Sequence, residues 1–496
     1  MRTIILTMIF LALVVSANNA QPEDLHKMGE KGYALVLDMQ FEQANKIFNE
    51  MVRVKPENAL GHLLLALSYG QMWKINDFDD ERFGKKYKEQ LVKARDIAEG
   101  MLDKNEDDID ALFYTGCAYG NLGRFYMNIK KWFDSYVNGS KGSEYLQKVL
   151  EKDPDRYDAY LGIGMFHYYR EALPNYSMML FLVRGDVEGY IKKGINEITR
   201  TVSKGKYLSD EAKIILATEI YIEHERNYIA ALPLLEELTI KYPNNYFLKL
   251  YLAECYGNTD NQEQAIQTTE HLIQSCSLKE KKYLLNRLYF NLGRAYNNSN
   301  EFEYAVMAFE KALEIPQFKA RSLFYIGNAY EMMGKVDKAR VSYNRIKKGD
   351  NIDVYIDARR RMNRLLTPSQ INFLKGTNYL SCKEYEQAAV LFYDLLESEF
   401  KKEKPDKAFI ANVYFNIGRV EYELKEYKKA INSFRKILDS SYVKLDYVKP
   451  WSHYYLANMY RKAGKTQKAK EEYDMAYIYN GKVLRTLVDV AMKEME

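Results

Sequence analysis

A repeat with a period of 34 residues restricts the fold of this 496-residue chain more than any other feature. Between Tyr289 and Pro316, small and large apolar residues stand in a fixed order, and the next stretch repeats that order 34 residues later. Small residues let two helices approach closely, large apolar residues fill the grooves between helices, and Gly or Asn permits the bend. The repeat therefore predicts stacked helix hairpins. Its first copy is carried by Leu292, Gly293, Tyr296, Phe302, Ala305, Phe309, Ala312 and Pro316.

The small residue of the first helix can be followed along the whole chain, which predicts about eleven hairpins. The positions are Gly32, Ala66, Gly116, Gly162, Ala217, Ala253, Gly293, Gly327, Gly376, Gly418 and Ala457. Their spacing varies from 34 to 55 residues, so we expect some hairpins to have lengthened helices or loops. The match to the repeat is weakest between Ala66 and Ala217.

This order of residues resembles that of the tetratricopeptide repeat (TPR) family, most specifically in the C-terminal half. The resemblance implies an all-α fold, a right-handed superhelical α-solenoid of about eleven TPR-like helix hairpins, some with lengthened helices. The irregular middle, from Trp132 to about Tyr228, looks like a variant TPR module of exported bacterial repeat proteins.

The N-terminus predicts an export signal. Arg2 precedes the apolar run 4–15, which is too short to span a bilayer, and small and polar residues follow it. Cleavage is expected after Ala17 or Ala20, and the exported protein is expected in the periplasm or cell envelope of a Gram-negative bacterium. The predicted parts are a signal peptide (1–20), a TPR-like solenoid with irregular middle repeats (21–349), an extra helix or joint (350–366), C-terminal TPR repeats (367–481) and a capping helix (482–496). Thr367, Pro368 and Gln370 predict a capping box at the start of the C-terminal repeats.

Composition and motifs argue against several function classes. The 72 Lys and Arg against 68 Asp and Glu lack the excess of positive charge typical of nucleic-acid binders. The six histidines are scattered without zinc spacing, and the phosphate-binding and serine-hydrolase motifs are absent. We therefore predict no enzyme, no catalytic residues, no metal ligands and no cofactor. An enzyme would need titratable groups that converge near Trp132, His167 and Asp186. The sequence does not decide whether Cys255 and Cys276 form a disulfide.

The TPR resemblance implies a concave groove lined by the first helix of each hairpin. Carried over position by position, it nominates Arg294, Asn297, Asn298, Asn328, Glu331, Arg419, Tyr422, Asn458 and Arg461 as partner-binding residues. Such donors suit the backbone carbonyls and carboxylates of an extended or acidic partner; alternatively they only line a hydrated, empty groove. The carboxylate clamp that holds chaperone C-termini needs Lys where this chain has Phe290, Phe324, Phe415 and Tyr454. These aromatics either pack between helices or form sockets for a partner.

The sequence thus predicts a non-catalytic protein–protein interaction scaffold of the bacterial cell envelope, with a partner bound in the concave groove. The partner is a protein or peptide of unknown identity. The alternative is a glycan- or cell-wall-binding protein on the same scaffold. We expect no nucleic-acid partner and no transmembrane segment after signal cleavage.

Overall fold

The computed structural model describes residues 22–76, 78, 80–172, 189–275, 282–438, 447–478 and 482–495. Every regular element in these residues is a helix, which confirms the predicted all-α class. The predicted export signal lies outside the described residues, as do Asp186 and Cys276. None of the described helices is both long enough and apolar enough to cross a membrane.

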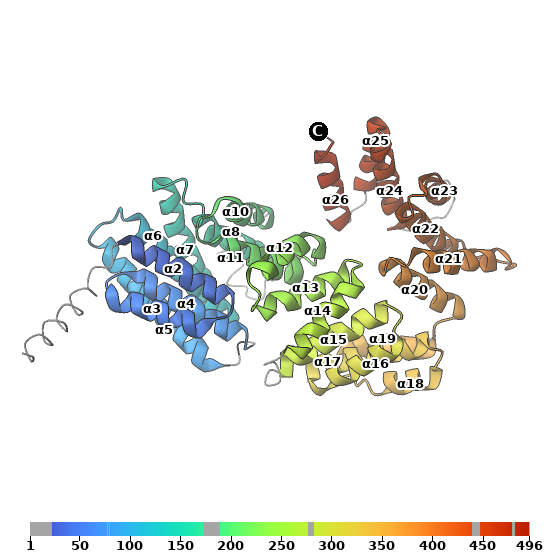
Figure 1. Cartoon of the computed structure of the whole chain (residues 1–496), viewed down its shortest axis with the longest axis horizontal. Helices are drawn as coiled ribbons and strands as arrows, with labels where there is room; N and C mark the ends of the chain where they lie inside the picture. The colour runs from blue at the N-terminus through green and yellow to red at the C-terminus, as the bar shows by residue number, and fades with distance from the viewer. Residues whose placement is uncertain are drawn as a thin grey trace, which may run out of the picture. The chain divides into compact units, whose positions relative to one another are not determined.

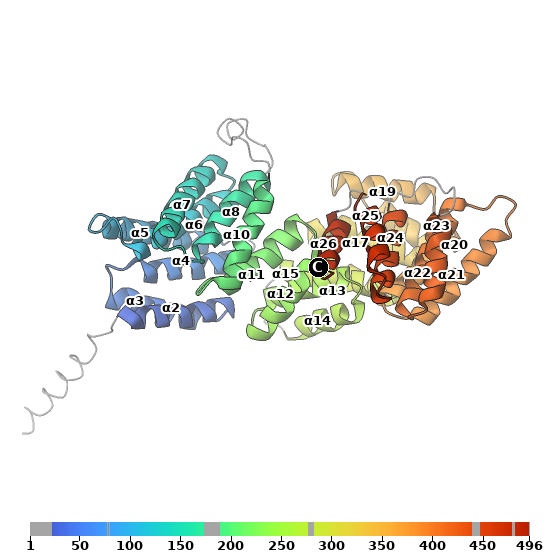
Figure 2. The same ribbon diagram turned by 90° about the horizontal axis from the view of Figure 1, so that it is seen from above.

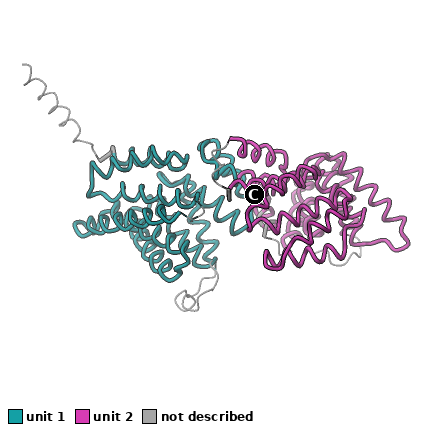
Figure 3. The backbone as a smooth tube through the Cα atoms, turned by 90° about the horizontal axis from the view of Figure 1, so that it is seen from below, with its two compact units in different colours: residues 1–251 teal, residues 252–496 magenta. Residues whose placement is uncertain are grey.

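The chain divides into two compact units, Met1–Tyr251 and Leu252–Glu496, which we call unit 1 and unit 2 (Figure 3). In unit 1, α2 pairs with α3, α4 with α5, α6 with α7 and α8 with α10, while α11 and the π-helix η1 pair with α12 (Figure 1). The bounds are α2 (Pro22–Leu37), α3 (Phe41–Val54), α4 (Ala59–Lys74), α5 (Glu81–Leu102), α6 (Ile109–Asn128), α7 (Trp132–Lys152), α8 (Ala159–Ala172), α10 (Tyr190–Lys204), α11 (Ser209–Ile214), η1 (Ile215–His224) and α12 (Tyr228–Lys241).

Unit 2 continues with helix pairs of the same kind. Figure 2 shows α20 to α23 side by side, and each of these helices packs on the next. The bounds are α13 (Tyr246–Asn258, which contains the division), α14 (Gln262–Gln274), α15 (Lys282–Asn298), α16 (Phe302–Lys311), η3 (Ala312–Glu314), α17 (Pro316–Met332), α18 (Val336–Asn344), α19 (Ile352–Asn363), α20 (Pro368–Ser381), α21 (Tyr385–Phe400), α22 (Lys407–Glu423), α23 (Tyr427–Leu438), α24 (Val448–Lys462), α25 (Thr466–Tyr477) and α26 (Lys482–Lys493).

The hairpins cross at the predicted small positions. All eleven lie on the first helix of successive hairpins, from Gly32 on α2 to Ala457 on α24. At Gly327 an added Cβ would stand 2.4 Å from the ring of Tyr343, so only a glycine lets the two helices approach this closely. The same close contact, with an aromatic residue sixteen positions later, joins Gly32 to Phe48, Gly293 to Phe309, Gly376 to Phe392 and Gly418 to Phe434.

The bend of most hairpins contains one residue in the left-handed backbone region. It follows the small position by seven residues in the first hairpin, at Met39 (φ 61°), and in the hairpins of unit 2, as at Lys425 (φ 62°). In three other hairpins of unit 1 it comes nine to fourteen residues after the small position, at Arg226, Phe78 and Lys130. Glycine adopts this conformation without strain, and Gly334 and Gly464 occupy it in two hairpins. The bend is therefore set by the geometry of the hairpin, even where the residue is unfavourable.

The segment 350–366, predicted as an extra helix or joint, contains a helix but does not divide the chain. Helix α19 lies there and packs on α17 and α18, with Ala358 buried in one core with Leu323 and Tyr343. The hairpins on both sides of α19 lie within unit 2, and the division falls between Tyr251 and Leu252 instead. The capping box at Thr367 and Gln370 is present where the sequence predicts it, and α26 packs on α25 at the C-terminal end.

Candidate functional site

The inner helices of unit 1 surround a cavity of about 460 Å³. Its walls come from α2, α4, α6, α7, α8, α11 and η1, together with the turn before α11 and the end of α12. Most of the wall is apolar or aromatic, and the glycines of α6 and α7 that line it contribute no side chain. Gly120 stands on the wall between Cys117 and Arg124, and no neighbouring atom lies within 4 Å of where its Cβ would be. The inner face of α6 therefore leaves space rather than filling it.

Contacts between the first and last hairpins of unit 1 help to enclose the cavity. The backbone N–H of Asn244 donates to Asp38 Oδ1 at 2.8 Å, and Asn245 Nδ2 donates to the backbone oxygen of Leu37 at 2.6 Å. His26 on α2 also stacks on Tyr207, with ring centroids 5.9 Å apart. The residues after α12 thus hold the C-terminal end of α2.

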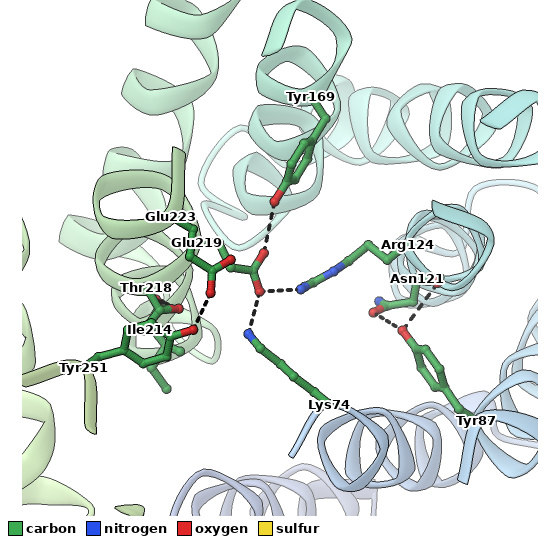
Figure 4. Close-up of polar contacts among 10 residues, drawn as sticks. All are labelled: Lys74, Tyr87, Asn121, Arg124, Tyr169, Ile214, Thr218, Glu219, Glu223 and Tyr251. Carbon is green, nitrogen blue, oxygen red and sulfur yellow. Dashed lines mark hydrogen bonds and ion pairs between the residues drawn. The ribbon is translucent and has the colours of Figure 1, made fainter. Parts of the chain in front are cut away.

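A buried ionic cluster lies beside the cavity (Figure 4). Glu219 on η1 accepts hydrogen bonds from Lys74 Nζ (2.8 Å), Arg124 Nη2 (2.7 Å) and the Tyr169 hydroxyl (3.2 Å). Burial works to raise the pKa of Glu219, but the charges of Arg124 and Lys74 outweigh it and lower that pKa to about 2. Glu219 is therefore ionised at neutral pH, and two cations face one carboxylate.

Glu211 is a second buried carboxyl group, on the cavity wall itself. Burial raises its pKa, although the charge of Arg124 and a hydrogen bond from Tyr33 oppose the rise. Its Oε2 atom is buried without a hydrogen-bond partner among the described residues. An unsatisfied buried polar atom is costly, so this carboxyl group lowers the stability of unit 1.

The repeat pattern does not reveal this cluster, because its members are far apart in the chain. Lys74 and Arg124 lie 145 and 95 residues from Glu219, on helices with different local patterns. One weak signal was available. A glutamate in the otherwise apolar run of η1 is expected to have a buried partner.

In unit 2, several predicted groove residues have partners within the chain. The hydroxyl of Tyr343 donates to Asn328 Oδ1 at 2.6 Å, and Tyr473 donates to Asn458 Oδ1 at the same distance. Both asparagines directly follow the small position, and both tyrosines replace the phenylalanine of the other hairpins. This Asn–Tyr pairing was a readable sequence signal that assigns Asn328 and Asn458 to hairpin packing.

Other predicted residues contact sequence-distant helices of unit 2. Arg294 Nη2 donates to Asn258 Oδ1 at 3.0 Å, and Arg419 Nη2 lies 3.6 Å from Asp260 Oδ2. Asn378 on α20 donates to the backbone oxygen of Asn297 at 3.0 Å. These bonds link the ends of α13 and α15 to α20 and α22.

The remaining predicted groove residues also have partners within the chain. The backbone oxygen of Asn298 accepts from Cys382 Sγ, and the buried Glu331 lies 3.6 Å from Arg361. Lys462 lies over the ring of Tyr422, and Arg461 pairs with Glu494.

The aromatics at the clamp position pack between helices. Phe290 and Phe415 are buried. Phe290 lies 5.5 Å from the ring of Phe318, and Phe415 lies 6.2 Å from that of Tyr455. Of the two alternatives that the sequence left open, the structure places these two residues in the core.

His167 is also internal. Its Nδ1 lies 2.6 Å from Glu197 Oε2, both side chains are buried, and its ring stacks on Tyr190 at 5.0 Å. It is not on the cavity wall, and Asp186 lies outside the described residues. In the part of the chain that the structure describes, no three His, Cys, Asp or Glu residues gather in a way that could hold a metal ion.

Two models of the tetratricopeptide repeat family match the chain, one at residues 287–318 and 411–442 and the other at residues 321–348. The chain is a tetratricopeptide repeat protein. All three matched stretches lie in unit 2, where the sequence pattern is clearest. The match supports a protein–protein interaction scaffold, a role for which TPR folds are generally used without catalysis.

Similarity to individual proteins is low. No curated protein matches this TPR protein. A tetratricopeptide repeat protein from Parabacteroides merdae is 13% identical, with 57% of this chain and 98% of that one covered and a TM-score of 0.23. The structure of the APC/C hetero-tetramer Cut9–Hcn1 is 15% identical, with 98% of each chain covered and a TM-score of 0.27. The apo form of RapI is 14% identical, with 73% of this chain and 97% of that one covered and a TM-score of 0.34. At scores this low, none of the three bears on the shape or function of this protein.

Proposed function

We propose that this TPR protein is exported into a bacterial cell envelope and holds a protein partner on unit 2, without catalysis. The observation that carries the proposal is the distribution of exposed apolar side chains. Fifteen of the twenty large hydrophobic residues that are exposed among the described residues belong to unit 2. Exposed apolar surface that gathers in patches is typical of protein interaction sites.

Helix α21 shows the clearest patch. Val390, Tyr393 and Phe400 are exposed and share one face of the helix, at spacings of three and seven residues. Tyr304 and Met307, three residues apart on α16, form a second exposed pair. These side chains face outward from the hairpins, so a partner can reach them without a change in the core.

The predicted inner-face residues stay part of the proposal. Arg294, Asn298 and Arg419 are partly exposed, and the guanidinium groups keep donors beyond those used within the chain. A partner with carboxylates or free carbonyls suits these donors. Export rests on residues 1–20, whose apolar run and small residues fit a cleaved signal.

Affinity capture from the native envelope extract tests the proposal. The outer-face variant carries Met307→Ser, Val390→Ser and Phe400→Ser, and the inner-face variant carries Arg294→Ala, Asn298→Ala and Arg419→Ala. The matched control changes three exposed apolar residues of unit 1, with Ile129→Ser, Phe133→Ser and Ile240→Ser. We expect a protein that co-purifies with the wild type and the control but not with the outer-face variant.

Three other outcomes contradict the proposal in different ways. Loss of the partner only in the inner-face variant moves the site to the inner face. Retention of the same proteins by all variants removes unit 2 as the binding region. Recovery of glycan or cell-wall fragments in place of a protein supports the alternative of a glycan-binding scaffold.

A further inference from the structure

The cavity of unit 1 has the size and walls of a small-molecule site. Its volume of about 460 Å³ lies within the roughly 300–1,000 Å³ that small-molecule pockets occupy. Such pockets are lined mainly by apolar and aromatic side chains, with a few polar groups that orient the ligand. Here the aromatic wall includes Phe113, Trp132 and Phe166, and the polar groups include Arg124 and Glu211.

Two of these polar groups have unused hydrogen-bonding capacity. Glu211 is 8% exposed, and its Oε2 atom is buried without a partner in the described part of the chain. Arg124 donates to Glu219 from Nη2, which uses one of the five N–H donors of a guanidinium. The Arg124 side chain keeps 27% of its surface accessible, and it lies on the cavity wall. A ligand in the cavity can therefore reach the Arg124 guanidinium.

The charge around these groups favours an anion. Lys74 and Arg124 face the single carboxylate of Glu219, so this cluster retains one positive charge. Burial raises the pKa of Glu211, while the charge of Arg124 and a hydrogen bond from Tyr33 oppose the rise. A cationic head group would instead be repelled by Lys74 and Arg124, because the carboxylate of Glu219 already pairs with both.

We propose that the cavity of unit 1 binds a small carboxylate-bearing amphiphile, with its apolar body between the helices of the wall and its carboxylate at Arg124. The guanidinium supplies charge-assisted N–H donors to the ligand carboxylate. This site is separate from the protein partner proposed for unit 2, so either proposal can fail alone.

Titration calorimetry on the purified protein, with no partner present, tests the proposal. The probes are decanoate, decan-1-ol and decylammonium at neutral pH, which share a tail and differ in the head group. We expect decanoate to bind at one saturable site, about tenfold or more tighter than decylammonium. Absence of saturable decanoate binding, or equal affinity for the two charged probes, would overturn the proposal.

Two variants test where the apolar tail and the head group of the bound probe lie. Gly120→Leu extends a side chain into the open space on α6, so decanoate affinity should fall about tenfold or more while the helical signal in circular dichroism is unchanged. Arg124→Gln leaves Lys74 to pair with Glu219, and it should weaken decanoate about tenfold but decan-1-ol less than about threefold. Unchanged decanoate affinity in Gly120→Leu excludes the cavity, and equal losses for both probes in Arg124→Gln exclude Arg124 as the head-group site.

Discussion

The inner helices of unit 1 surround a cavity of about 460 Å³, whereas the inner-face residues of unit 2 bond to one another across its hairpins. Glycines and a buried ionic cluster mark the first face, and Arg, Asn and Tyr side chains mark the second. The outer surfaces differ in the opposite sense, because most of the exposed large hydrophobic residues lie in unit 2. One hairpin design thus serves two uses. The small-residue crossing determines how a hairpin packs, while the residues beside it decide whether its inner face stays open.

Removal of the ionic cluster should have the largest effect on the difference between the two units. Glu219→Ala leaves Lys74 and Arg124 buried without their carboxylate, so unit 1 should lose about 3–5 kcal/mol of unfolding free energy. Urea unfolding in a Trp451→Phe background measures this, because the remaining tryptophans, Trp73 and Trp132, both report on unit 1.

The ion pair of Lys213 with the exposed Glu237 provides the control for this change. Glu237→Ala should alter the unfolding free energy by no more than about 1 kcal/mol, as is usual for surface ion pairs. If the two variants lose the same amount, the buried cluster does not stabilise unit 1.

Acid should act on the same carboxylate. The charges of Arg124 and Lys74 overcome the effect of burial and hold the pKa of Glu219 at about 2, below its ordinary value of 4.5. Because the folded value is the lower one, this stabilisation is complete above about pH 4.5 and is lost as the pH falls toward 2. The unfolding free energy of unit 1 should fall by about 3 kcal/mol over that window through Glu219 alone. The Glu219→Ala variant should lack this part of the acid response.

The Asn–Tyr pairs of unit 2 should show a smaller effect than the buried ionic cluster of unit 1. Tyr473→Phe leaves the buried Asn458 Oδ1 without its hydrogen bond, and the opening free energy of α24 and α25 should fall by about 1–3 kcal/mol. Hydrogen–deuterium exchange of peptides from these two helices measures the change. Adding Asn458→Leu removes both polar partners and should recover most of the loss. A double variant as unstable as the single one would mean that the hydroxyl matters for another reason.

The smallest expected effect distinguishes two glycines of α6. Gly120 faces open space, so Gly120→Ala should raise the unfolding free energy of unit 1 by about 0.5–1 kcal/mol, because alanine loses less backbone entropy in a helix. At Gly116 the new Cβ would stand 2.7 Å from Leu146 Cγ, so Gly116→Ala should act in the opposite direction. Thermal unfolding of both variants in parallel measures the two signs, and a destabilised Gly120→Ala would argue against an open cavity wall.

The sequence predicted the parts of the fold that depend on local order. The contact of Gly327 with Tyr343 spans sixteen residues and recurs in other hairpins, so a single chain reveals it by comparison with itself. The capping box at Thr367 and Gln370 was predicted because all of its atoms belong to one turn of chain.

The candidate site could not be predicted in the same way. Glu219 meets Lys74 and Arg124 only because hairpins far apart in the chain converge, and no period in the sequence records that convergence. The inner-face positions carried over from the TPR pattern do not predict such contacts either. Arg294 and Asn297 occupy predicted groove positions, yet their partners come from other helices of unit 2.

The π-helix η1 bears on how proteins of this kind can change over generations. Its hydrogen bonds reach one residue farther along the chain than those of an α-helix, and Glu219 lies within it. Deletion of one residue between Ile215 and Glu219 would favour α-helical geometry in this segment and would change the direction in which the Glu219 side chain points. The carboxylate would then turn away from Lys74 and Arg124, while the repeat pattern elsewhere would be untouched. A single insertion or deletion could therefore add or erase the charged cluster in a descendant without loss of the hairpin architecture.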